Sequence, residues 1–129
     1  MTLSNRATPL IDDAWSLHED AQGMLSQGRL RNVAEMARGA TEHATDAVIL
    51  ERTGREPGTS GIACRGIRAL RHQNIEPESL VNRYSQRVQD LHGSVFYDSI
   101  LDPQEPIVRD IHATADYSRD AERLADVSV

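Results

Sequence analysis

Apolar residues recur at steps of three and four along several long stretches of this chain, and no stretch alternates apolar and polar residues with a period of two. Steps of three and four place side chains on one face of an α-helix, whereas a half-buried strand needs the period of two. The clearest stripe consists of Leu80, Val81, Tyr84, Val88, Leu91 and Val95. The pattern therefore predicts an all-α fold.

Glycine and proline residues divide the chain into the expected helices. Gly28 and Gly54 stand where the first two helices should stop, and Pro106 suits the first position of the last one. The expected helices run over residues 11–27, 30–52, 62–72, 78–101 and 106–125. We expect residues 1–10 to form a flexible segment and residues 11–126 to form one domain, an antiparallel four-helix up-and-down bundle with an additional short helix.

The composition supports helix packing and limits the classes of partner. Aromatic residues make up 4% of the chain, so the core must be built mainly from Ala, Leu, Ile, Val and Met. The net charge of −6 argues against tight, sequence-independent binding to nucleic acid, although basic residues could still gather in one groove. No apolar run approaches the length of a membrane span, and the lone Cys64 cannot form an internal disulfide. These features predict a cytoplasmic protein that does not enter a membrane.

The histidines are the natural candidates for chemistry. His18, His43, His92 and His112 fall on four different expected helices, so a bundle could gather them around a metal ion. However, none of them follows a glutamate at the Glu-x-x-His spacing of di-iron bundles, and no HExxH sequence occurs. We therefore expect neither a metal nor a cofactor, and we interpret the histidines as residues at helix edges that make single hydrogen bonds.

An arginine and a histidine together could cleave RNA without a metal. The histidine can accept or donate a proton, and the cation stabilises the charge that grows on the phosphate. Three pairs have a suitable spacing, namely Arg87 with His92, Arg38 with His43, and Arg65 with His72. On an α-helix, Arg87 and His92 lie about 140° apart, so they would meet only if the long arginine folds back or a second subunit contributes its own copy. Spacing alone does not choose among the pairs.

Two parts of the chain resemble the HEPN superfamily, which consists of small all-α bundles of prokaryotic toxin–antitoxin and defence systems. The first part spans residues 14–57, where an alanine-rich stretch precedes Gly54 and Pro57 and carries Ala21, Ala34, Ala37-Arg38-Gly39-Ala40, Glu42-His43-Ala44 and Ala47-Val48-Ile49-Leu50. This part is similar to the first two helices of the family. The second part is residues 80–98, where Arg87-x4-His92 is similar to the family's Arg-x(4–6)-His motif.

The resemblance selects Arg87 and His92 as the candidate catalytic pair and implies two functions. In ribonucleases of the family, often toxins, two motifs meet in one cleft of a homodimer; Arg87 would contact the phosphate and His92 would act as general acid or base. Other members bind partner proteins, often a nucleotidyltransferase. Active members commonly carry a polar residue where Val88 stands, and Tyr97 is displaced from their frequent His-x-Tyr. We therefore expect a non-enzymatic binding or adaptor module, with the metal-independent ribonuclease as the alternative.

Overall fold

The computed structural model describes residues 6–58, 63, 65, 66, 68, 69, 82–85 and 88–125. Three α-helices, α1 (Thr8–Leu25), α2 (Leu30–Thr53) and α5 (Gln104–Ala125), accompany a π-helix, η1 (Val88–Tyr97). All regular secondary structure in the described residues is helical, which confirms the all-α prediction. None of the described helices is long and apolar enough to cross a membrane. The short helix expected over 62–72 lies mostly outside the described residues, as does Cys64.

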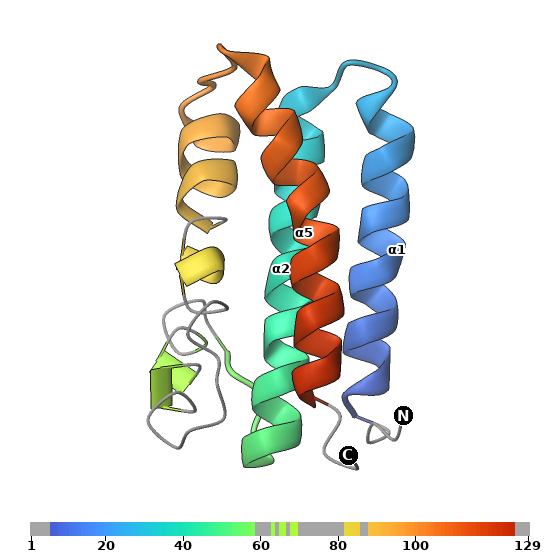
Figure 1. Ribbon diagram of the computed structural model, residues 1–129, viewed down its shortest axis with the longest axis vertical. Coiled ribbons are helices and arrows are strands. Elements are labelled where there is room, and N and C mark those ends of the chain that lie inside the picture. The colour runs from blue at the N-terminus through green and yellow to red at the C-terminus, as the bar shows by residue number, and fades with distance from the viewer. Residues whose placement is uncertain are drawn as a thin grey trace.

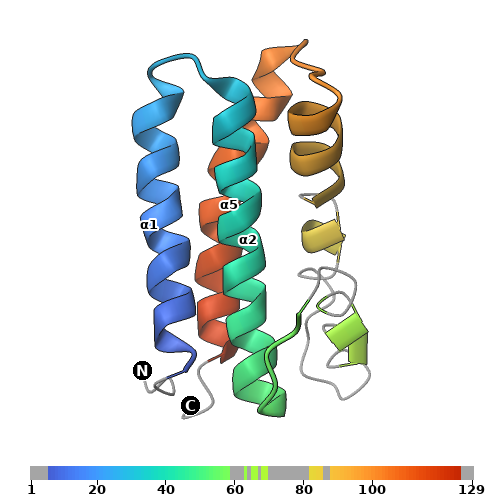
Figure 2. The ribbon, with the colours of Figure 1, turned by 180° about the vertical axis from the view of Figure 1, so that it is seen from behind.

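The α2 helix occupies the centre of the fold and contacts α1, α5 and η1 (Figures 1 and 2). From the end where the chain begins, α1 runs up, α2 runs down, η1 runs up and α5 runs down (Figure 1). The helix α1 and the π-helix η1 lie on opposite sides of α2 (Figure 2). A polar side chain on α2 can therefore reach α1, η1 or α5, depending on its position around the helix.

The boundaries of α2 match the expectation to within one residue. Its last turn ends at Gly54, which has a φ of 78° and donates its N–H to the carbonyl of Leu50 at 2.8 Å. Glycine adopts this left-handed conformation without the steric penalty that a Cβ imposes. The preference of glycine for this conformation depends only on the residue type at position 54, so the sequence was sufficient to locate the end of α2.

Several other boundaries differ from the expectation. The first helix begins at Thr8, within the segment expected to be flexible, because Pro9 is compatible with the first turn and Ala7 is fully buried. The last helix begins at Gln104, since the first turn also tolerates Pro106, whose missing N–H would have no helical partner there. The long helix expected to reach residue 101 ends as a π-helix at Tyr97; Ser99 then has a φ of 57°, which a right-handed helix cannot continue.

Small residues allow α1 and α2 to approach closely. The α2 residues Ala37, Ala40, Ala44 and Ala47 are fully buried, and a Cβ added to Gly39 would lie 3.4 Å from Cδ1 of Leu17 on α1. Around this seam the core forms two clusters, one near the start of α1 and the end of α5, the other near the α1–α2 turn. The alanine-rich stretch of the sequence is thus the tightly packed centre of the fold.

We expect Ala44→Leu to lower the free energy of unfolding by about 1–3 kcal/mol, because the added methylenes have no space in the fully buried seam. Gly23→Ala is the matched control. A Cβ at Gly23 would meet no atom within 4 Å, so this substitution should stabilise α1 by about 0.5–1 kcal/mol. Urea denaturation followed by circular dichroism measures both changes. Equal stability of Ala44→Leu and the unmodified chain would contradict the tight seam.

Candidate functional site

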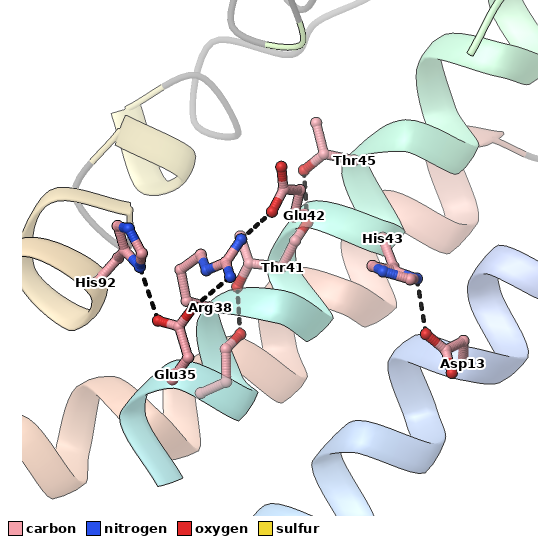
Figure 3. A network of polar contacts seen from close by, with 9 residues as sticks. Asp13, Glu35, Arg38, Thr41, Glu42, His43, Thr45 and His92 are labelled. Atoms are coloured by element: carbon pink, nitrogen blue, oxygen red, sulfur yellow. Dashed lines mark hydrogen bonds and ion pairs between the residues drawn. The ribbon is translucent and has the colours of Figure 1, made fainter. Parts of the chain in front are cut away.

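His92 lies on η1 and faces α2, where its Nδ1 is 2.8 Å from Oε2 of Glu35 (Figure 3). A carboxylate accepts hydrogen bonds, so Nδ1 carries the proton and donates it to this contact. In the neutral ring the basic nitrogen is then Nε2. Arg87, the expected partner of His92, lies outside the described residues, as do the side chains of Val88 and Tyr97.

Glu35 belongs to a ladder of charged side chains along one face of α2. Arg38 forms ion pairs with Glu35, three residues before it, and with Glu42, four residues after it (Figure 3). These spacings place all three side chains on neighbouring turns of the same face. Glu35 therefore joins Arg38 on its own helix to His92 on η1, and the three α2 side chains are about three-quarters buried.

The carboxylates hold Arg38 in its charged form. Burial alone would lower the pKa of Arg38, but the hydrogen bond to Glu35 and the negative charges of Glu35 and Glu42 raise it above its ordinary value. Both terminal guanidinium nitrogens bind a glutamate, and the buried Nε has no hydrogen-bond partner among the described residues. The hydrogen-bonding capacity of Arg38 is thus directed at its own helix.

Asp46 continues the ladder one turn beyond Glu42. Burial, together with the negative charges of Glu42 and Glu56, raises the pKa of Asp46 to about 7. A carboxyl group with this pKa exchanges its proton near neutral pH, and its neighbours are acidic. This face of α2 consequently carries more negative than positive charge in the described residues.

A second polar contact lies beside the ladder, between α2 and α5. The hydroxyl of Thr45 donates to the carbonyl of Thr41 at 2.7 Å, so the phenol of the fully buried Tyr117 donates to Oγ1 of Thr45 at 2.5 Å. Arg83 lies over the ring of Tyr117, 5.2 Å from its centre, and forms an ion pair with Asp120 at 2.8 Å. These contacts attach the helical residues 82–85 to α5.

The other arginine–histidine pairs do not form a site in the described residues. Arg38 points toward Glu35 and Glu42, whereas the ring of His43 points away from Arg38 (Figure 3). Nδ1 of His43 lies 2.7 Å from Oδ2 of Asp13 on α1. Arg65 is exposed, and His72 lies outside the described residues. The sequence spacing of Arg38 and His43 therefore does not bring their charged groups together.

The histidines do not converge on one point. His18 is buried between α1 and α5, where Nε2 lies 2.8 Å from the hydroxyl of Ser118, and His112 contacts Gln22 at 3.3 Å. Burial lowers the pKa of His18 to about 4. In the part of the chain that the structure describes, no three histidine, cysteine or carboxylate side chains lie close enough together to hold a metal ion.

The sequence pointed to His92 but not to Glu35. The available signal was the spacing Glu35-x2-Arg38-x3-Glu42, which predicts one charged face on α2. It does not reveal that a histidine 57 positions later lies against that face. No protein-family model, curated protein or solved structure matches the chain.

Proposed function

We propose that this chain is a HEPN-like helical module that binds a partner protein and performs no chemistry, as a homodimer or beside a nucleotidyltransferase-type partner. The alternating directions of α1, α2, η1 and α5 support a four-helix up-and-down bundle, with an additional short helix before η1 (Figure 1). The alanine-rich α2 at its centre supports the resemblance to the family. A cytoplasmic location agrees with the lone cysteine.

One observation carries the non-enzymatic assignment, namely the position of Arg38 between Glu35 and Glu42. A site that cleaves RNA must stabilise negative charge on a phosphate, and it does so with cations directed at that phosphate. Arg38, the cation that Glu35 links to His92, is already neutralised by two carboxylates. Asp46 adds a further acidic group. The electrostatics therefore favour a role for His92 in attaching η1 to α2.

We expect the purified chain to leave RNA intact during prolonged incubation with a metal chelator. His92→Ala should weaken the attachment of η1 to α2, lowering the free energy of unfolding by about 0.5–1.5 kcal/mol, without changing the oligomeric state. Gel analysis of the RNA, urea denaturation and sedimentation velocity provide the three measurements, and Arg119→Ala on the exposed face of α5 serves as a control. RNA cleavage that disappears in His92→Ala would contradict the proposal.

The hydrogen bond between His92 and Glu35 favours a second candidate, the metal-independent ribonuclease. A carboxylate that receives Nδ1–H fixes the tautomer and leaves Nε2 as the nitrogen that exchanges a proton with substrate, as general acid–base catalysis requires. In a dimer, Arg87 would supply the cation. For this candidate, His92→Ala and Arg87→Ala should each reduce cleavage by about 10²–10⁴-fold. Glu35→Gln should produce a smaller loss together with an altered pH profile.

A further inference from the structure

An apolar pocket of about 210 Å³ opens between η1, the loop at residues 98–103 and the first turns of α5. Its lining includes the buried side chains of Leu91, Val95 and Ile107. Ile100 stands in the same lining and is 52% exposed, which makes it the only exposed large apolar side chain in the described part of the chain. Together the pocket and Ile100 form a small apolar surface that a partner can cover.

Charged residues of both signs lie at the same end of the molecule as this pocket (Figure 1). Asp98 and Asp102 flank Ile100 on the same loop and are exposed, and neither forms an ion pair within the described residues. Arg29, exposed in the α1–α2 turn and likewise without an ion pair there, borders the same surface depression as Leu101. The α1–α2 turn and the η1–α5 loop lie at the same end of the molecule (Figures 1 and 2). One end thus carries an aliphatic side chain, a pocket, an acidic pair and an arginine.

We propose that a second copy of this chain docks on this end through a two-fold contact. In such a contact each pair of complementary residues occurs twice, once in each direction, so the surface must complement itself. Ile100 of each copy covers the pocket of the other, and Arg29 of each copy faces Asp98 and Asp102 of the other. The inference rests on the homodimer within the proposed function and assigns its surface; His92 does not line the pocket.

The charges determine which occupant suits this surface. The acidic pair flanking Ile100 favours a partner that presents an arginine beside an aliphatic side chain, and the same end of this chain presents both. A contact confined to one end of a small bundle is expected to be weak, and screening of the exposed charges should make it salt-dependent. Dimerisation should therefore strengthen as the salt concentration falls.

Sedimentation equilibrium of the full chain, over a range of concentrations at low and high salt, tests the proposal. Ile100→Asp, Arg29→Glu and Asp102→Arg should each raise the dimer dissociation constant at least about tenfold. Arg55→Glu, at the opposite end of α2, should leave it unchanged.

The decisive sample is an equimolar mixture of Arg29→Glu and Asp102→Arg. In the mixed dimer the glutamate introduced into one copy meets the arginine introduced into the other. The second half of the two-fold contact keeps its original pair, because the unmodified Arg29 of one copy meets the unmodified Asp102 of the other. Self-association that is lost in each variant alone should therefore return as a heterodimer.

The outcomes separate this surface from the proposed function. A dimer that persists in all three variants would overturn the surface and leave the homodimer in place. A chain that remains monomeric at every concentration would overturn both the surface and the homodimer. RNA cleavage dependent on His92 would overturn the non-enzymatic function and leave the surface standing. Circular dichroism of each variant confirms that these exposed substitutions preserve the fold.

Discussion

Tyr117→Ala should lower the free energy of unfolding by about 3–5 kcal/mol, the largest loss that we expect from a single substitution in this chain. The ring is fully buried in the cluster shared by α1, α2 and α5, so its removal leaves a cavity. The substitution also removes the hydrogen bond to Thr45 and the ring beneath Arg83. Urea denaturation measures the loss, and a change below about 1 kcal/mol would show that the ring does not fill the core.

Tyr117→Phe separates the hydroxyl from the ring. Phenylalanine keeps the packing and the surface under Arg83 but removes the donor to Thr45. The hydroxyl of Thr45 still donates to the carbonyl of Thr41, so we expect a loss of only about 1 kcal/mol. If the phenylalanine variant were as unstable as the alanine variant, the hydrogen bond would be the principal contribution.

The sequence predicted features that depend on local chemistry. The periodicity and Gly54 defined α2 almost to the residue, and the alanine-rich stretch indicated its close packing. The predicted start of α1 was wrong because Pro9 was interpreted as part of a flexible segment. Proline is equally compatible with a first helical turn. The π-helix was not predicted either, because the same apolar stripe fits an α-helix.

The site was predictable only in part. The resemblance identified His92 as a candidate, but its carboxylate partner comes from another helix and no periodicity indicates which helix faces which. The same limit applies to His18. It was interpreted as a helix-edge residue with a single hydrogen bond, whereas it is buried and contacts Thr114 and Ser118, about one hundred residues further along the chain. Both assignments needed the packed structure.

The dependence of stability on pH should reveal two groups that act in opposite directions. His18 has a pKa of about 4 in the folded protein and about 6.5 when unfolded, so the unfolded chain binds the extra proton between these values. This lowers stability by about 3 kcal/mol as the pH falls from 6.5 to 4. Asp46, with a raised pKa of about 7, makes the folded protein the stronger proton binder over a similar range. Its contribution lowers stability as the pH rises, by about 1–2 kcal/mol after screening by solvent.

The two contributions partly cancel in the unmodified chain. A variant that lacks one of the two groups should therefore show a steeper or a reversed dependence of stability on pH. In Asp46→Asn only the histidine term remains, so stability should rise by about 3 kcal/mol from pH 4 to 6.5. In His18→Gln only the aspartate term remains, so stability should fall over that range, whatever the variant's absolute stability. His112→Gln, at an exposed position, serves as the control. Chemical denaturation at several pH values measures the slopes, and identical slopes for Asp46→Asn and His18→Gln would contradict the opposed titrations, since the two contributions differ in sign.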